Sequence, residues 1–476
     1  MQVHARRRLC ASFIAAAMAS SAVAAEGDLD TTFGAGGFRL SGILDGYASL
    51  TSGMAVQPDG KILLCEGEST SPTSYDFFIA RFTADGAVDT SFSFDGHTTI
   101  DFGGNSDTCS GIVVQPDGKI VVAGTTTPDQ SANSDFAVAR LNSDGTLDTA
   151  GFGNGTGKTV VAFDLGGNNA DAATGVALRA DGRIVVAGSA ATASNGLDFA
   201  ILQLNTDGSR DTGFNLTGRV TVGFDLAGST TKTDVAQRVL IDASGRIVAA
   251  GFADHGLPGG LDMAVLRLLP NGQPDPDFNA DGRATLAFDL GGANGGNTDQ
   301  AVGMMIDRQE RIVLTGAADS STTSHTDPNT ANLDVAVARL LPDGSPDATF
   351  GIGGKTVIAF DLAPNGPDYG IAVLEQGNGR LYVAGTAIGL QAPPAYEYAT
   401  LVRLLPDGSP DTSFGTVGKR LYDFEQSTPS GQLFHSIAMQ GSKIVLGGAL
   451  NSVDITHIDF IVARITDDLI FADSFE

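Results

Sequence analysis

Pairs of aspartates recur in this sequence within Asp-Gly-x-x-Asp segments, and closely spaced carboxylates in a glycine-containing loop can bind calcium. The pairs are Asp85/Asp89, Asp144/Asp148, Asp207/Asp211, Asp343/Asp347 and Asp407/Asp411. Calcium takes about six to eight oxygen ligands, whereas each segment supplies only two carboxylates, and Asn271 replaces the first aspartate in a further copy. Asx turns that lead into a buried phenylalanine explain the same spacing. We therefore expect turns here, with a calcium site as the alternative.

A second series places an aspartate at the start of an apolar run and, in most copies, an arginine five residues later. The aspartates are Asp76, Asp135, Asp198, Asp262, Asp334 and Asp459, and the arginines are Arg81, Arg140, Arg267, Arg339 and Arg464. Repetition in nearly every copy predicts a structural role, because a catalytic site normally uses one position once. We expect each aspartate to accept hydrogen bonds from backbone amides of a neighbouring turn, and each arginine to pair with a loop carboxylate.

A third series of aspartates ends another apolar run in each copy. Its members are Asp101, Asp164, Asp225, Asp289, Asp361 and Asp423. Together with the second series they would surround one face of the fold predicted below, close to its centre. A ring of carboxylates can bind a cation, and caps on solvated loops are the alternative.

Histidines offer no further site. Those beyond the first 25 residues are His97, His255, His325, His435 and His457, and they show no metal-ligand spacing. The sequence has no Gly-x-Ser-x-Gly segment, no phosphate-binding loop and no tryptophan, the residue on which bound sugars usually stack. We therefore assign no catalytic, cofactor or metal-binding residue, and keep Ca²⁺ as a possible ligand.

Short strands must position these residues. In the segment Gly111–Gly124 two apolar runs flank Pro116-Asp117-Gly118, which predicts a β-hairpin. Seven variants recur, and the basic residues after their turns are Lys61, Lys119, Arg183, Arg246, Arg311, Arg380 and Lys443. The spacing ranges from 58 residues (Lys61 to Lys119) to 69 residues (Arg311 to Arg380), which indicates a repeat architecture.

Each repeat contains four strand-like runs, here called a, b, c and d. In the second copy they are 111–115, 119–124, 135–141 and 158–163. Four short antiparallel strands per repeat, without helical periodicity, predict an all-β fold, a seven-bladed β-propeller of four-stranded blades. The last repeat is divided between the chain ends. We expect strand d at 38–43 to join strands a to c near 434–465 and to close the ring.

Three repeated units carry a family resemblance: Val-Gln-Pro-Asp-Gly-Lys-Ile-Val-Val-Ala-Gly, Asp-Phe-Ala-Val-Ala-Arg-Leu and Pro-Asp-Gly-Ser-Pro-Asp-Thr-Ser-Phe-Gly. From about Gly27 to Asp467 the chain resembles the delta-60 repeat family of bacterial β-propellers. The resemblance implies a propeller in an exported protein and implies no established activity.

The N-terminal segment indicates the cellular location, and the overall charge limits the classes of partner. Arg6-Arg7-Arg8, the apolar stretch Leu9–Met18 and Ala22-Val23-Ala24 predict a signal peptide at 1–25. The propeller then covers 26–466, and 467–476 form a short C-terminal tail. We expect a periplasmic or extracellular protein. A net charge of −27 disfavours nucleic acid and anionic membranes as partners, and no run is long enough for membrane insertion.

Export makes Cys65 and Cys109 candidates for an intrachain disulfide, with Cys65 at the end of a strand b and Cys109 in the following d–a connection. The b–c connections vary most, and the longest, 317–333, contains His325 and Asp327. Variable loops favour the face with the b–c and d–a connections as the binding face. We expect a non-enzymatic binding or structural module for an unknown protein or small polar ligand. The alternative is a hydrolase or lyase with a polar site at the channel mouth.

Overall fold

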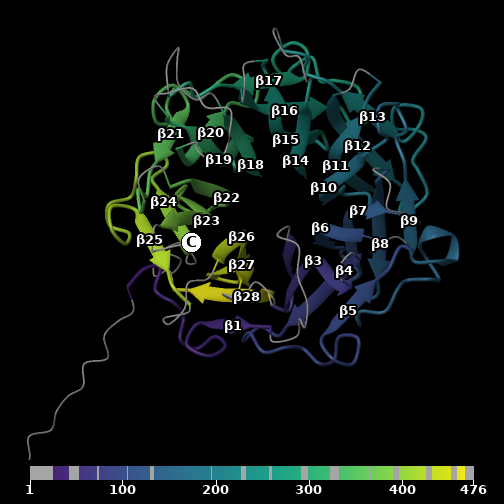
Figure 1. Ribbon diagram of the computed structural model, residues 1–476, viewed down its shortest axis with the longest axis horizontal. Helices are drawn as coiled ribbons and strands as arrows, with labels where there is room; N and C mark the ends of the chain where they lie inside the picture. Colours follow the sequence, from purple (N-terminus) through teal and green to yellow (C-terminus); the bar gives the residue numbers. More distant parts are fainter. Residues whose placement is uncertain are drawn as a thin grey trace, which may run out of the picture.

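Sheets arranged as a ring make up this structure (Figure 1). The computed structural model describes residues 25–41, 53–71, 74–103, 106–128, 133–193, 196–226, 232–256, 260–290, 298–321, 332–363, 366–389, 396–424, 431–451 and 458–466. Besides the strands, one 3-10 helix, η1 (Gly153–Gly155), is present in these ranges. None of the described segments is a helix long and apolar enough to cross a membrane.

Five sheets have four strands and one has eight. The eight-stranded sheet contains β2 (Gly53–Val56), β3 (Ile62–Ser71), β4 (Ser74–Phe82), β5 (His97–Ile100), β6 (Ser106–Val114), β7 (Ile120–Thr127), β8 (Asp135–Leu141) and β9 (Lys158–Val161). The next two sheets contain β10 (Asp171–Leu178), β11 (Ile184–Ala191), β12 (Leu197–Leu204) and β13 (Arg219–Val222), then β14 (Asp234–Ile241), β15 (Ile247–Asp254), β16 (Leu261–Leu268) and β17 (Arg283–Leu286).

The remaining sheets complete the ring. They contain β18 (Asp299–Ile306), β19 (Ile312–Asp319), β20 (Leu333–Leu340) and β21 (Lys355–Ile358), then β22 (Asp368–Glu375), β23 (Leu381–Gly389), β24 (Tyr396–Leu404) and β25 (Lys419–Tyr422), and finally β26 (Gly431–Gln440), β27 (Lys443–Asn451), β28 (Ile458–Ile465) and β1 (Phe38–Leu40).

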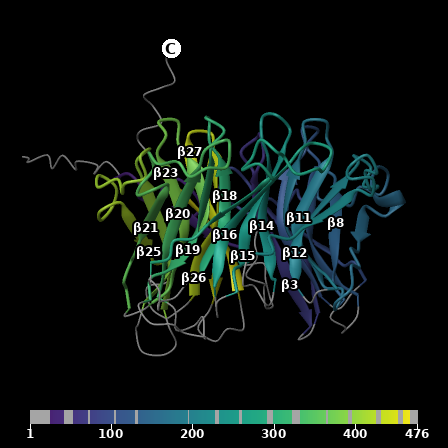
Figure 2. The same ribbon diagram turned by 90° about the horizontal axis from the view of Figure 1, so that it is seen from above.

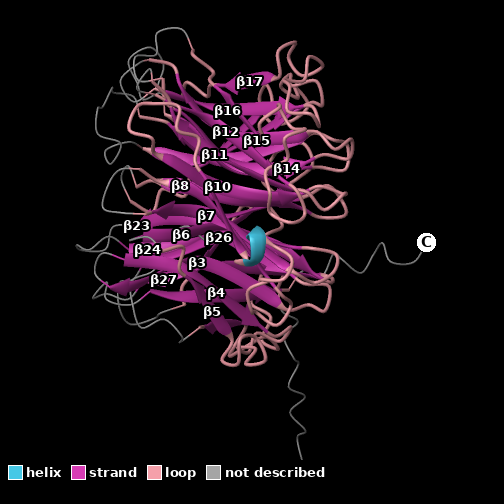
Figure 3. Cartoon of the chain, turned by 90° about the vertical axis from the view of Figure 1, so that its right-hand side faces the viewer, coloured by secondary structure: helices cyan, strands magenta, loops and turns pink. Residues whose placement is uncertain are grey.

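Neighbouring strands of each group of four are antiparallel, as the sequence predicts. The eight-stranded sheet consists of two such groups, β2–β5 and β6–β9, which are joined by a single parallel pair, Tyr75 and Ser106. Strands a lie nearest the ring axis and strands d lie outside (Figure 1). Figures 2 and 3 show the strands running between two loop-bearing faces. We call the face on which strands a and c begin, and b and d end, the aspartate face.

The N-terminal strand belongs to the last sheet. β1 pairs antiparallel with β28, Phe38 opposite Ala463 and Leu40 opposite Ile461. This confirms that the divided repeat is joined by its two chain ends. The predicted strand at 38–43 is shorter in the structure, because β1 ends at Leu40 and Ser41 already lies outside it; residues 42 and 43 lie outside the described ranges.

A disulfide joins Cys65 of β3 to Cys109 of β6, with Cα atoms 5.8 Å apart. The predicted bond is confirmed, but the predicted places of both cysteines are wrong. β3 continues to Ser71, so Cys65 lies inside a strand b and not at its end. β6 begins at Ser106, so Cys109 lies inside a strand and not in the connection before it. Both cysteines are buried within one apolar cluster between neighbouring strand groups.

Apolar clusters fill the space between adjacent groups of strands, and one buried phenylalanine recurs in the c–d connections. Its positions are Phe33, Phe92, Phe152, Phe214, Phe278, Phe350 and Phe414. Each ring except Phe414's lies against the glycine of an Asp-Gly-x-x-Asp or related loop in the following group, and Phe414 lies against Gly27. At Gly145, for example, φ is +92° and a Cβ atom would lie 2.9 Å from Phe92. The loop glycine is therefore fixed by both backbone conformation and close packing.

Candidate functional site

The repeated arginines hold the c–d connections in place. Their carboxylate partners give six pairs: Arg81 with Asp89, Arg140 with Asp148, Arg267 with Asp275, Arg339 with Asp347, Arg403 with Asp411 and Arg464 with Asp30. In each pair an arginine nitrogen lies 2.7–2.9 Å from a carboxylate oxygen. The basic residue after each hairpin turn approaches the same carboxylate, as Lys61 does at Asp89, 3.1 Å away. The predicted pairing of arginines with loop carboxylates is confirmed.

The other aspartate of each Asp-Gly-x-x-Asp segment caps its own turn. Oδ1 of Asp144 accepts hydrogen bonds from the amide of Thr146 at 3.0 Å and from its hydroxyl at 2.6 Å. At Asp89, burial raises the carboxyl pKa. Hydrogen bonds from Ser91 and Lys61 and the charge of Arg81 outweigh this effect and lower the pKa to about 2. Both carboxylates of a segment are thus occupied by local partners, which favours the turn interpretation over calcium.

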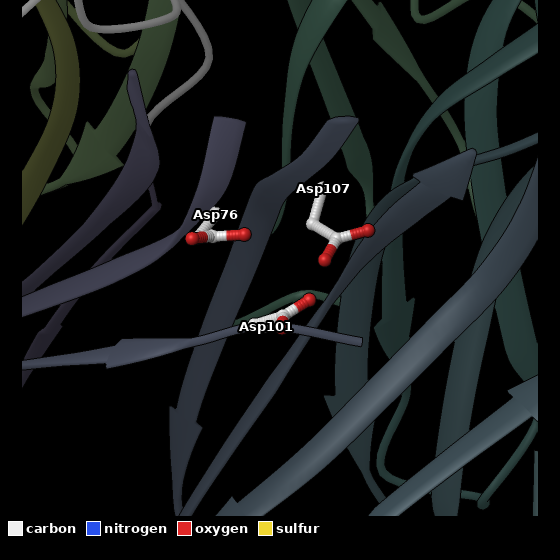
Figure 4. A group of neighbouring side chains, drawn as sticks. All are labelled: Asp76, Asp101 and Asp107. Atoms are coloured by element: carbon white, nitrogen blue, oxygen red, sulfur yellow. The ribbon is translucent and has the colours of Figure 1, made fainter. Parts of the chain in front are cut away.

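A different set of aspartates gathers on the aspartate face. Asp76 lies near the start of β4, Asp101 directly follows β5, and Asp107 lies near the start of β6 (Figure 4). One carboxylate oxygen from each lies within 4.8 Å of the others. Within the described residues this is the group whose geometry best suits a metal ion. It combines the second and third aspartate series, which the sequence analysis placed together on this face.

The same three positions carry aspartates in four further copies. These sets are Asp135/Asp164/Asp171, Asp198/Asp225/Asp234, Asp262/Asp289/Asp299 and Asp334/Asp361/Asp368. We refer to the five sets as the aspartate trios. In the last four trios the charges interact: Asp164 raises the pKa of both Asp135 and Asp171, and Asp361 raises the pKa of both Asp334 and Asp368. Repulsion between the carboxylates therefore recurs around the face.

The sequence analysis missed the third member of each trio. These residues are Asp107, Asp171, Asp234, Asp299 and Asp368, and each lies at the start of a strand a. One signal was present: each aspartate precedes the first residue of the hairpin segment by four positions, as Asp107 precedes Gly111. A search at the repeat period, and not only within the hairpin, would have found them.

These third members accept the kind of backbone-amide hydrogen bond that was predicted for the Asp76 series. Oδ2 of each accepts a hydrogen bond from the amide of a phenylalanine after strand d, at 2.5–2.7 Å. The phenylalanines are Phe102, Phe163, Phe224, Phe288 and Phe360. In these five copies the amide-binding role predicted for the start of strand c is thus filled at the start of strand a of the following group.

The second oxygen of each third member is buried without a hydrogen-bond partner. This holds for Oδ1 of all five residues. Burial, followed by nearby aspartates, raises the pKa of Asp234 to about 6 and of Asp299 and Asp368 to about 7. A buried carboxylate oxygen beside other carboxylates attracts either a proton or a cation.

The sixth copy has an amide in place of the third carboxyl. Gln432 Oε1 accepts the Phe424 amide at 2.9 Å, and its Nε2 donates to Asp423 Oδ1 at 3.0 Å. Tyr398 stands where other copies have the strand-c aspartate. In the last sheet Asp459 accepts a hydrogen bond from Ser41 at 3.2 Å. The trio is thus a property of five interfaces between strand groups.

The structure does not bring the described histidines together. His97 stacks on Phe78, with ring centroids 5.1 Å apart, and His255 lies 3.6 Å from Asp262. His435 lines a cavity of about 210 Å³ on the ring axis, together with Arg238. His325, Asp327 and His457, and the tail 467–476, lie outside the described residues.

The comparisons with known proteins support the repeat fold. The family model described as "Domain of unknown function (DUF5122) beta-propeller" matches residues 57–92, 115–150, 179–214, 243–278, 329–350 and 396–414. These matches identify β-propeller repeats along the chain. No curated protein is significantly similar to it in sequence.

Several solved structures resemble this one at low identity. The polysaccharide lyase Uly1 is 10% identical over 88% of this chain and 90% of that chain, with a TM-score of 0.48. The β-propeller domain of the Trilobed protease from Pyrococcus furiosus is 10% identical over 88% and 98%, with a TM-score of 0.38. The α-L-arabinofuranosidase Arb93A from Fusarium graminearum is 12% identical over 74% and 92%, with a TM-score of 0.40. No activity is transferred to this chain from likenesses of this degree.

Proposed function

We propose that this β-propeller repeat protein is an exported, non-enzymatic binding module whose aspartate face takes up divalent cations, with Ca²⁺ as the first choice. The observation that carries the proposal is the buried, unpartnered Oδ1 of the third aspartate in each trio. In the first trio, one oxygen from each of the three carboxylates lies within 4.8 Å of the others. In the other four trios, aspartates at the same positions lie close enough to raise one another's pKa. The bound cations would stabilise the loops through which the face contacts a protein or a small polar ligand.

The blade count and the family are part of this proposal. Five four-stranded sheets and the two groups of the eight-stranded sheet correspond to seven blades. The units that resemble delta-60 repeats support assignment to that group. The disulfide between Cys65 and Cys109 supports export, since such bonds persist in oxidising compartments. The signal peptide at 1–25 and a periplasmic or extracellular location remain predictions.

The first trio has the oxygens that a weak calcium site needs. Asp107 Oδ2 is occupied by the Phe102 amide and Asp101 Oδ1 by the Gly103 amide, at 2.7 and 2.5 Å. Asp107 Oδ1, the second oxygen of Asp101 and the carboxylate of Asp76 supply three ligands, and water would complete the set of about six to eight. So few protein ligands suit a dissociation constant of roughly 10⁻⁴–10⁻³ M, the range of extracellular modules.

The enzymatic alternative, a hydrolase or lyase at the channel mouth, has less support. It requires an acid and a base at one place that does not repeat. Of the described residues that line the cavity on the ring axis, none is an aspartate or glutamate. The carboxylates recur from copy to copy instead, as expected of binding or structural positions.

Calcium titration of the full chain tests the proposal. Protein stripped with a chelator and examined by isothermal titration calorimetry at pH 7.5 should bind Ca²⁺ with a dissociation constant near 10⁻⁴–10⁻³ M. The variant Asp107→Asn should lose one site, because it keeps the acceptor for the Phe102 amide and removes the charge. The control Asp144→Asn changes an exposed turn carboxylate and should leave the titration unchanged. Absence of saturable heat for the wild type, or equal effects of the two variants, would overturn the cation sites.

A further inference from the structure

The cavity on the ring axis is lined mainly by small and apolar residues from the innermost strands. Equivalent positions of strands a carry Gly53, Gly111, Gly175, Arg238, Gly303, Ala372 and Ser436. Small residues are required where inner strands approach closely. A Cβ atom on Gly111 would lie 2.9 Å from Val176, and one on Gly303 would lie 2.4 Å from the carbonyl oxygen of Ile371. Arg238 departs from this pattern and places a guanidinium on the axis.

No carboxylate compensates this guanidinium. Arg238 forms no ion pair with any residue in the described ranges, although the protein has 55 acidic residues. Its recorded contact is a hydrogen bond of 3.0 Å from Nη1 to the carbonyl oxygen of the adjacent Gln237. Burial lowers the Arg238 pKa, and no acidic group opposes that effect. The fully buried arginines, such as Arg81 and Arg339, have aspartate partners, whereas Arg238 is half-buried and lines the cavity.

His435 is the second polar residue to consider, and it lies at a position that differs from copy to copy. It occupies the bulge position of β26, where β6 has Ser110 and β10 has Thr174. Burial and the charge of Arg238 lower the His435 pKa to about 3, so the imidazole is neutral at pH 7. A neutral imidazole adds no charge that would oppose the guanidinium.

The backbone around this pair is held by the repeat itself. Strands a of neighbouring groups contact each other through their bulges, and the hydroxyl of Thr174 donates to the carbonyl oxygen of Ala236 at 2.7 Å. This bond crosses from β10 to β14, two residues from Arg238. The Arg238 backbone is therefore held by strands and not by a loop, and its side chain lines the cavity.

We propose that the axial cavity binds a small oxyanion, a carboxylate, sulfate or phosphate group, through the Arg238 guanidinium with His435 beside it. A planar guanidinium recognises such groups by paired N–H donors, and buried charges in proteins are normally paired. The cavity volume of about 210 Å³ fits a group of a few heavy atoms. The site is independent of the aspartate trios, because it uses none of their residues.

The test compares the wild type with Arg238→Gly, which restores the glycine found in four other copies and should fold. Titration of each full-length protein with sodium phosphate, sulfate or acetate, followed by calorimetry at constant ionic strength, distinguishes the sources of the oxyanion. At least one anion should bind the wild type saturably, and its dissociation constant should rise at least tenfold in Arg238→Gly. Arg308→Gly is the matched control, because it removes an exposed arginine of β-hairpin 306–312 and should bind as the wild type does.

Stability in anion-poor buffer gives a second readout. Removing a half-buried charge that has no ion pair should leave the melting temperature of Arg238→Gly equal to or above that of the wild type, whereas loss of a structural contact would lower it. Failure of all three anions to bind the wild type would overturn the proposal. So would equal binding by the wild type and Arg238→Gly, or a lower melting temperature of that variant without added anion.

Discussion

Arg464 and Asp30 lie 434 residues apart in the chain, and Nε of Arg464 donates a hydrogen bond to Oδ2 of Asp30 at 2.8 Å. Lys443 Nζ approaches the same carboxylate. Asp30 is buried, and these contacts hold its pKa well below the usual value despite the opposing effect of burial. One side chain of the segment that precedes β1 therefore contacts both β27 and β28.

Asp30→Asn should destabilise the protein strongly. It would leave the Arg464 guanidinium without its carboxylate partner, and breaking a buried pair costs about 3–5 kcal/mol. Urea unfolding at pH 7 measures the change in free energy. Asp59→Asn, which alters an exposed turn residue beside Lys61, should cost less than about 1 kcal/mol. Deleting residues 26–41 removes β1 as well and should destabilise more than Asp30→Asn. An unchanged unfolding midpoint in either case contradicts closure by the N-terminal segment.

The disulfide should contribute substantially to stability. Its cysteines are 44 residues apart, and closing a loop of that length stabilises the folded state by about 4 kcal/mol in the chain-entropy model. Cys65→Ala combined with Cys109→Ala should therefore lower the unfolding free energy by several kcal/mol. Thiol counting in denatured, unreduced protein provides the direct check: two free thiols in the exported protein would show that the bond does not form.

The aspartate trios should make stability depend on pH in a defined window. The pKa values of Asp234, Asp299 and Asp368 are raised to about 6–7 by burial and neighbouring carboxylates. Raised carboxyl pKa values mean that their contribution is fully present below about pH 4 and is lost as the pH rises through 6–7. In chelator, stability should therefore fall between about pH 4 and 7, on the order of 3 kcal/mol for each carboxyl.

Asparagine at these three positions should remove most of that slope, because its side-chain oxygen can still accept the phenylalanine amide. The sixth copy already uses Gln432 in this way. Asp30 and Asp89, whose pKa values are lowered, act in a separate window below about pH 4. Added Ca²⁺ should reduce the slope in the wild type. A slope unaffected by the triple substitution would show that other groups control this range.

Glu66 should be a destabilising residue at neutral pH. It is fully buried in β3, neither carboxyl oxygen has a hydrogen-bond partner, and burial raises its pKa well above the usual value. The other copies have glycine here, as at Gly124. Glu66→Gln should raise the unfolding free energy at pH 8 by about 1–3 kcal/mol and change it little at pH 4. The same change at both pH values, or a loss at pH 8, would show that the carboxylate has a stabilising partner.

The repeat made most of the fold predictable. Alternating apolar runs and the Pro-Asp-Gly turn gave the strands, and the divided repeat gave the pairing of β1 with β28. Repetition also identified the arginine–aspartate pairs, since each uses the same spacing. Functional positions were harder for the same reason. Arg238 stands where the other copies have a small residue, and His435 lies at a variable bulge position. They are almost 200 residues apart in the sequence, and the folded ring brings both to the same axial cavity. Asp107 was missed because its partners come from a neighbouring group of strands.

The pairing of β1 with β28 also orders the events of folding. β1 is synthesised before the other strands and its partner β28 after them, so the last sheet cannot be completed until all the other strands have been made. The other sheets consist of contiguous segments and can form from local hairpins, which close quickly. Joining the two chain ends brings together residues more than four hundred positions apart, and contacts at such separation form slowly. Completion of the ring is therefore expected to be the slow, final phase of refolding.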